Sequence, residues 1–375
     1  MKSLDHPGSC KASQERGTSR PPRLLLQWHL SDRCNLRCAH CYQDDFREVS
    51  RGLVGWRELL DRVLAFLHGP GGNAAIPAHI NVTGGEPFAI AEFPALMEVF
   101  ARHRRDFDFG ILSNGTLVDR PTARQVKSWG TRFVQVSIEG GRETHDRIRG
   151  PGTYERAIAG LHALKAERVP TLIAFTAQRA NWREFPAVAA LGKEVGAQRV
   201  WADRMIPAGQ ADRQQVLDAD ETRAFLELMA KTREPLRFFS RRGIAMKRAL
   251  QFLVAENETP YRCTAGDTLL TLMPDGTLYP CRRLPIALGN LYEMPLARLY
   301  DTEIPRQLRD PLWQGEGCGD CVLASACRGG LRCLSYALHG RLDRADPGCW
   351  LAAAAAATSA PAATSATATA AATAA

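Results

Sequence analysis

The stretch Cys34-Asn35-Leu36-Arg37-Cys38-Ala39-His40-Cys41-Tyr42 decides the fold, because its cysteines have C-x3-C-x2-C spacing. A loop this short can place three thiolates on three irons of a cubane cluster and leave the fourth iron free. Zinc is the alternative, although zinc motifs usually come as C-x2-C pairs closed by a second pair or by histidines. No second pair lies nearby and His40 is interpreted as loop packing, so an iron–sulfur cluster is expected.

The composition is that of a globular protein of 375 residues, with 45% hydrophobic and 23% charged side chains. The N-terminus lacks the apolar segment of a signal peptide, and the alanine-rich end is too weakly hydrophobic to span a membrane. We therefore expect a cytoplasmic protein, in which clustered cysteines bind metal rather than form disulfides. The net charge of +8 is not gathered into a basic, aromatic-rich run, so neither nucleic acid nor membrane is an expected partner.

Strand and helix patterns alternate over about two hundred residues, which predicts an α/β fold with a parallel sheet and right-handed crossovers. The expected strands are Leu24–Leu30, His79–Thr83, Phe107–Ser113, Phe133–Ile138, Thr171–Ala177 and Arg199–Asp203. The expected helices follow them at Trp56–Leu67, Phe93–His103, Thr122–Trp129, Tyr154–Glu167, Phe185–Val195 and Glu221–Lys231. Six such units are fewer than a complete barrel needs, and function is expected at the carboxyl ends of the strands.

Polar motifs fall at these strand ends. Gly84-Gly85-Glu86-Pro87 follows the second strand, Ser113-Asn114 ends the third, Ser137-Ile138-Glu139-Gly140 closes the fourth, and Arg149 lies shortly beyond. With the cysteine loop upstream, this arrangement resembles the radical SAM enzymes. The resemblance implies a partial (β/α)6 TIM-like barrel whose cluster on Cys34, Cys38 and Cys41 binds S-adenosylmethionine at its open iron, where an electron cleaves it to a 5′-deoxyadenosyl radical.

The same resemblance suggests how the cosubstrate is held. Gly84, Gly85, Glu86 and Pro87 would contact its amino group, Ser137 its ribose, and Arg149 its carboxylate, with Ser113 and Asn114 nearby. This chain has Glu139 where aspartate is commoner in the family, so no role is assigned to that carboxylate. Helix capping or loop packing is the alternative for each of these residues taken singly.

Seven further cysteines follow the βα repeat. They are Cys263, Cys281, Cys318, Cys321, Cys327, Cys333 and Cys349. Cys263, Gly276 and Cys281 have C-x12-G-x4-C spacing, and Met273–Gly276 is expected to be a hairpin turn between two strands. The pattern resembles the SPASM domain, which carries auxiliary iron–sulfur clusters in many peptide-modifying radical SAM enzymes.

The resemblance implies two auxiliary clusters. Cys318, Cys321, Cys327 and Cys349 would fully ligate one, and Cys263, Cys281 and Cys333 would hold the other with an iron open to substrate or water. The spacing between Cys327 and Cys333 is two residues longer than the family's usual C-x3-C, which leaves the partition between clusters open. Zinc is again the structural alternative.

Five segments are expected. They are a flexible tail at 1–22 that contains Cys10, a radical SAM barrel at 23–235, a linker at 236–262, a SPASM domain at 263–350, and a low-complexity Ala/Thr tail at 351–375.

The expected function is a radical SAM oxidoreductase that abstracts hydrogen from a ribosomal peptide or protein residue for oxidation or crosslinking. An external donor of flavodoxin or ferredoxin type would supply electrons, and either a separate protein or the barrel itself would bind a leader peptide. Small-molecule chemistry on a tetrapyrrole or sugar alcohol, or a zinc-binding interaction protein, are the alternatives. Arg282 stands where sulfatase-maturing relatives commonly have an aspartate base, which argues against that branch. Tyr279, His145 and Asp203 are unranked candidate bases.

Overall fold

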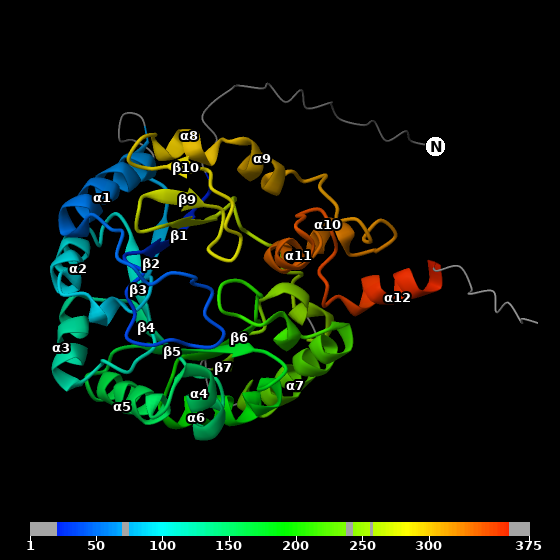
Figure 1. The fold of residues 1–375 in the computed structure, drawn as a ribbon, viewed down its shortest axis with the longest axis horizontal. Helices are drawn as coiled ribbons and strands as arrows, with labels where there is room; N and C mark the ends of the chain where they lie inside the picture. Colours follow the sequence, from blue (N-terminus) through cyan, green and yellow to red (C-terminus); the bar gives the residue numbers. More distant parts are fainter. Residues whose placement is uncertain (1–20, 70–74, 238–242, 256–257, 360–375) are drawn as a thin grey trace, which may run out of the picture.

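The computed structural model describes residues 21–69, 75–237, 243–255 and 258–359. Within these ranges the strands form one ten-stranded sheet in the order β10-β9-β8-β1-β2-β3-β4-β5-β6-β7. The run from β8 through β1 to β7 is parallel throughout. It curves into an open barrel with helices around its outer side (Figure 1). The α/β fold expected from the sequence is confirmed.

The strands of the barrel are β1 Leu24–His29, β2 Ala78–Thr83, β3 Asp108–Ser113, β4 Phe133–Ser137, β5 Thr171–Ala177, β6 Arg199–Arg204 and β7 Gly243–Ile244. The first six lie where the apolar runs predicted them, and β5 has the predicted bounds. Alternate side chains of β1 fill the core on one face of the strand, as in Leu24, Leu26 and Trp28, each at most 2% exposed. Such burial is typical of parallel strands covered by helices.

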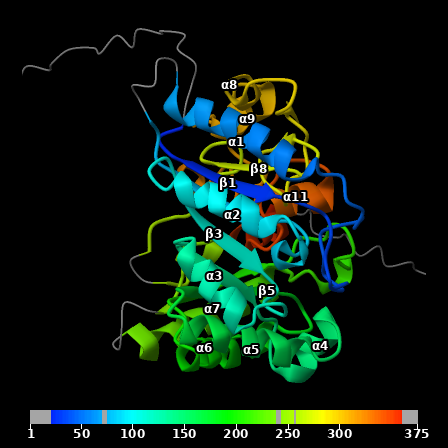
Figure 2. The same ribbon diagram turned by 90° about the vertical axis from the view of Figure 1, so that its left-hand side faces the viewer.

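The helices of the barrel are α1 Gly52–His68, α2 Phe93–Arg102, α3 Arg120–Ser128, α4 Arg142–Arg149, α5 Thr153–Ala166, α6 Phe185–Glu194 and α7 Ala219–Arg237, with 3-10 turns η2 Pro87–Ala89, η3 Trp182–Glu184 and η4 Arg213–Gln215. Proline lies in the first turn of α2, α3 and α6. Backbone N–H groups in a first turn have no partner within the helix, so the missing N–H of proline costs no hydrogen bond there. Figure 2 shows β1 and β3 pointing the same way beneath α1, α2 and α3. Among the α-helices of the barrel, α4 is the one that the sequence patterns do not predict.

The C-terminal region consists of η5 Ala249–Leu253, β8 Leu269–Leu272, β9 Thr277–Tyr279, β10 Gly289–Asn290, α8 Leu296–Tyr300, α9 Glu303–Arg309, α10 Ala324–Cys327, α11 Arg332–His339 and α12 Trp350–Ser359. The predicted hairpin is confirmed, because β8 and β9 pair antiparallel across a turn in which Gly276 has φ +87°. Strand β8 also pairs in parallel with β1, from Leu25 opposite Leu269 to Trp28 opposite Leu272. One sheet therefore joins the barrel to the cysteine-rich region.

The predicted flexible tail falls mostly on residues outside the described ranges, as does Cys10. The described part of the Ala/Thr segment begins as helix α12. None of the helices in the described ranges is both long and apolar enough to cross a membrane.

Candidate functional site

A cavity of about 250 Å³ opens at the carboxyl ends of the barrel strands. Its wall includes all three loop cysteines and residues from β2 to β6. The predicted site residues that line it are Cys34, Cys38, Cys41, Gly84, Gly85, Ser113, Asn114, Ser137 and Arg149. Ligands of parallel α/β sheets bind at this edge, so the predicted location and the observed cavity agree.

The cysteine loop is held from three directions. Ala39 N–H donates to the carbonyl of Ile148 at the end of α4, at 2.8 Å, and Gln210 N–H donates to the carbonyl of Cys41 at 2.7 Å. The Cys41 N–H turns back to the Cys38 carbonyl at 3.0 Å. These backbone contacts set the course of the loop that carries the thiols.

The three thiols affect one another electrostatically. Burial raises the pKa of the Cys34 thiol to about 11, opposed by the Leu36 N–H, and the neighbouring Cys38 and Cys41 raise it further. Burial likewise raises the pKa of Cys38, although the Arg149 guanidinium counteracts this. Three thiolates this close favour a bound cation, which would neutralise them.

Gly84 and Gly85 lie directly against the start of the cysteine loop. Gly85 N–H donates to the Ser31 carbonyl at 2.8 Å, and the next residue donates to the Arg33 carbonyl at 2.9 Å. A Cβ on Gly85 would lie 2.0 Å from the Arg33 carbonyl oxygen, and one on Gly84 would lie 2.4 Å from the Ser31 oxygen. Both positions need glycine because two backbones meet there.

The Glu86 side chain is fully buried. Its carboxylate accepts from the Ser113 hydroxyl and from the Asn114 N–H, both at 2.8 Å. Burial raises the pKa of Glu86 to about 7 despite these bonds. Glu86 thus ties the end of β3 to the glycine turn, and neither Glu86 nor Pro87 is among the cavity-lining residues.

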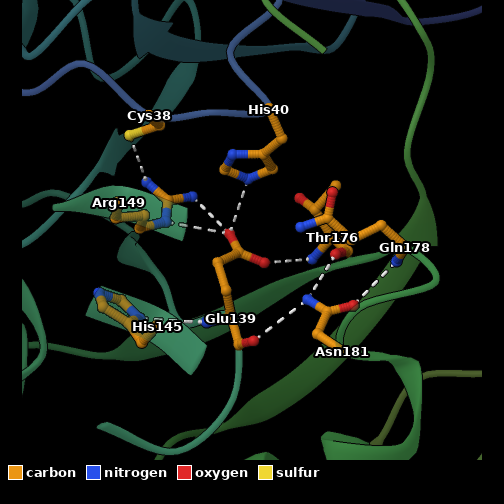
Figure 3. A network of polar contacts seen from close by, with 8 residues as sticks. All are labelled: Cys38, His40, Glu139, His145, Arg149, Thr176, Gln178 and Asn181. Atoms are coloured by element: carbon orange, nitrogen blue, oxygen red, sulfur yellow. Dashed lines mark hydrogen bonds and ion pairs between the residues drawn. The ribbon is translucent and has the colours of Figure 1, made fainter. Parts of the chain in front are cut away.

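Glu139 is the centre of a buried network beside the cysteine loop (Figure 3). Its Oε1 accepts from Arg149 Nη2 at 2.5 Å and lies 3.2 Å from His40 Nε2, and its Oε2 accepts from Thr176 N–H at 2.8 Å. Burial would raise the pKa of this carboxyl, but Arg149 and His40 outweigh it and lower the pKa to about 2. Arg149 Nη1 also lies 3.9 Å from Cys38 Sγ. An ionised Glu139 therefore holds Arg149 and His40 against the loop.

The cavity lining also includes Arg282 and Arg283, which follow Cys281, and Trp201, Asp203 and Arg204 of β6. Asp203 accepts from Arg283 Nη2 at 2.7 Å. Burial opposes ionisation of Asp203, but Arg283 and Arg248 prevail and lower its pKa. The cavity thus reaches from the first cysteine motif to the second.

The three candidate bases differ in whether they line the cavity. Asp203 lines the cavity, whereas His145 and Tyr279 do not. His145 Nδ1 accepts from the Glu139 N–H at 3.2 Å, and burial with the nearby Arg149 lowers its pKa to about 4. No sequence pattern favours Asp203 over the other two, since its ion pair with Arg283 joins residues eighty positions apart.

The C-terminal cysteines fall into two neighbourhoods. Cys318, Cys321, Cys327 and Cys349 surround a second cavity of about 30 Å³. Burial raises the pKa of Cys333 well above its usual value, and Cys281 and Cys263 add to this rise while Arg283 opposes it. These neighbours match the two ligand sets inferred from resemblance, and the ligand assignment itself stays a prediction.

The donor sets fit iron–sulfur clusters. The cysteines of the described residues are free thiols. Among those residues no three His, Cys, Asp or Glu side chains converge closely enough to hold a single metal ion. A cluster does not need such convergence, because each thiolate binds a different iron.

Comparisons with known proteins define the class. Residues 28–191 match the Radical SAM superfamily, and residues 263–322 match SPASM, an iron-sulfur cluster-binding domain. The chain therefore contains a radical SAM domain and, C-terminal to it, a SPASM domain.

Its relatives act on different substrates. An AdoMet-dependent heme synthase from Methanosarcina barkeri is 29% identical over 351 residues, which are 88% of this chain and 96% of that protein. The mycofactocin maturase MftC from Mycolicibacterium smegmatis is 28% identical over 357 residues, 89% of this chain and 84% of that protein. The fold is shared with anSMEcpe bound to AdoMet and the Cp18Cys peptide, with a TM-score of 0.70 at 20% identity, covering 88% of this chain and 94% of that one.

Proposed function

We propose that this protein is a radical SAM oxidoreductase that modifies a side chain of a peptide or protein. The observation that carries the proposal is the single cavity that joins Cys34, Cys38 and Cys41 to the arginines beside Cys281. A substrate in that cavity would lie between the site of radical formation and an auxiliary site. Such a position suits oxidation, because an electron can leave after a hydrogen atom is removed.

The size of the cavity favours a peptide. At about 250 Å³ it lies just below the usual 300–1,000 Å³ range for sites that enclose a drug-sized ligand. S-Adenosylmethionine would share this cavity with the substrate. A peptide needs to insert only one side chain beside the cosubstrate.

Cys34, Cys38 and Cys41 would hold the first cluster, and the two C-terminal sets would hold two auxiliary clusters. With S-adenosylmethionine bound, the first cluster supplies reductive cleavage to a 5′-deoxyadenosyl radical, using electrons from an external flavodoxin- or ferredoxin-type donor. Gly84 and Gly85 bring the β2 turn against the loop, and Ser137 and Arg149 present a hydroxyl and a guanidinium for the cosubstrate.

Asp203 is the residue we propose as proton acceptor. It carries the one carboxylate among the described residues that line the cavity. Although burial opposes ionisation, Arg283 and Arg248 lower its pKa, so it is ionised and free to accept a proton, and moving Arg283 away on substrate binding would make it a stronger base. Asp203→Asn should reduce product formation more than it reduces 5′-deoxyadenosine formation.

A tetrapyrrole is the second candidate substrate. Four arginines line the cavity, namely Arg149, Arg204, Arg282 and Arg283, and the similar proteins include the heme synthase from Methanosarcina barkeri. Guanidinium groups suit the carboxylates of such a macrocycle. This substrate would require the cavity to open further than a peptide side chain would.

The deciding measurement is iron and sulfide content of anaerobically reconstituted protein, beside a Cys34→Ala/Cys38→Ala/Cys41→Ala variant, with dithionite and S-adenosylmethionine added to both. We expect about twelve irons in the wild type, about eight in the variant, and 5′-deoxyadenosine from the wild type alone. Stoichiometric zinc without iron or cleavage would refute the proposal.

A further inference from the structure

Arg282 differs from the other arginines of the cavity wall. Three of them have carboxylate partners: Arg149 with Glu139 at 2.5 Å, Arg204 with Asp346 at 2.5 Å, and Arg283 with Asp203 at 2.7 Å. Arg282 makes no ion pair within 4.0 Å among the described residues. Asp32 is near enough to feel its charge, but its Oδ1 accepts from Gln43 instead, at 2.9 Å.

The contacts that Arg282 does make leave donors unused. Its Nη2 donates to the Tyr42 carbonyl at 3.2 Å, and its guanidinium stacks 4.5 Å from the centre of the Tyr42 ring. Its Nε is buried and has no hydrogen-bond partner in the described part of the chain. A buried donor without an acceptor is costly, and a planar guanidinium is best satisfied by a carboxylate that accepts two hydrogen bonds.

We propose that Arg282 binds a carboxylate of the substrate. The residue follows Cys281 and rests on Tyr42, which follows Cys41, so it lies between the two cysteine sites. A carboxylate held here would fix the substrate between the point of hydrogen abstraction and the auxiliary site. The inference rests on the proposed function and specifies its substrate as an anion.

Two sources can supply that carboxylate. One is an Asp or Glu side chain or the C-terminus of a peptide, and the other is a propionate of a tetrapyrrole. Both present the same geometry to a guanidinium, and the experiment below separates them.

The test compares wild type with Arg282→Gln and Arg282→Glu, all reconstituted anaerobically and loaded with S-adenosylmethionine. Arg51→Gln is the matched control, because the Arg51 guanidinium also stacks on a tyrosine, 3.8 Å from the Tyr292 ring centre, outside the cavity. The first probe is a random peptide library in which enriched sequences are read out. The second is coproporphyrin III beside its tetramethyl ester, with binding measured at equilibrium.

We expect that the binding of one probe requires both the carboxylates of that probe and Arg282. For a peptide source, wild type and Arg51→Gln enrich Asp and Glu, Arg282→Gln loses the preference, and Arg282→Glu shifts it to Lys and Arg. For a tetrapyrrole source, the free acid binds about 10- to 100-fold more tightly than the ester, and Arg282→Gln abolishes that difference.

Two results would overturn the proposal. One is probe binding by Arg282→Gln that matches wild type for both probes. The other is a loss of S-adenosylmethionine affinity in Arg282→Gln as large as its loss of probe affinity, which would assign the guanidinium to the cosubstrate. Failure of the proposed function is separate, since it shows as absent 5′-deoxyadenosine in the wild type.

Discussion

Replacing Asp346 by asparagine should loosen the cysteine-rich region from the barrel. Asp346 accepts from both Nη atoms of Arg204, at 2.8 and 2.5 Å, and from the N–H groups of Leu331 and Gly348, each at 2.9 Å. Arg204 ends β6, whereas Asp346 lies between Cys333 and Cys349. The ion pair therefore spans the two regions.

The expected size of the effect follows from burial. The Arg204 and Asp346 side chains are 3% and 0% exposed. Removing one member of a buried pair leaves an uncompensated charge, which costs about 3–5 kcal/mol. Asparagine keeps the shape but not the charge, so Asp346→Asn should lower the free energy of unfolding by roughly that amount.

Urea unfolding under anaerobic conditions would measure this change, with iron content determined on the same samples. Asp343→Asn is the matched control on the same loop, because Asp343 pairs with Arg341 at the surface, where the side chains are 47% and 50% exposed. An exposed pair contributes little to stability, because solvent screens it. An Arg204→Met/Asp346→Asn double variant, measured beside Arg204→Met alone, removes both charges while the asparagine oxygen keeps an acceptor for a backbone N–H, so it should recover part of the lost stability.

Two outcomes would refute this reasoning. If Asp346→Asn and Asp343→Asn unfold at the same urea concentration, burial does not set the strength of the pair. If the double variant loses the sum of the two single losses, the residues are not coupled.

Three further predictions concern other positions. Burial raises the pKa of Glu86 to about 7 from 4.5. The contribution of Glu86 to stability is therefore complete below about pH 4.5 and is lost as pH rises through about 7, a change of about 3 kcal/mol. Urea titrations at about pH 5 and pH 8 should show this fall in the free energy of unfolding, and Glu86→Gln should flatten it. Gly85→Ala should prevent iron loading of the first site, since its Cβ would meet the Arg33 carbonyl, whereas Gly243→Ala, whose Cβ meets nothing within 4 Å, should load normally. Gly348→Ala should lower thermal stability, because its Cβ would lie 2.1 Å from an Arg204 nitrogen.

The sequence was most informative where function depends on local spacing. The cysteine loop, the Gly84–Gly85 turn and the six apolar strands each occupy a few consecutive residues, and all were placed where the structure has them. Helix α4 was missed because its eight residues contain five charged side chains and little apolar periodicity, with Thr144, His145 and Ile148 as its buried residues. A short polar helix gives no signal that a window of sequence can detect.

Local sequence patterns do not indicate which residues far apart in the chain pair with each other. Strand β8 was predicted as part of a hairpin, but nothing local indicates that it also extends the barrel sheet beside β1. Asp346 is one acidic residue among many, and its partner lies 142 positions away. In the sequence, Arg282 stands out only because sulfatase-maturing relatives commonly have an aspartate at this position. Its place in the cavity wall depends on the folded chain.

The end of β6 connects the barrel to both C-terminal cysteine groups. Asp203 and Arg204 are consecutive, and successive side chains of a strand leave it in opposite directions. Asp203 therefore reaches Arg283, beside Cys281, while Arg204 reaches Asp346, beside Cys349. A displacement of this one strand end would move both groups relative to the cavity, so loss of either ion pair should alter both auxiliary sites rather than one.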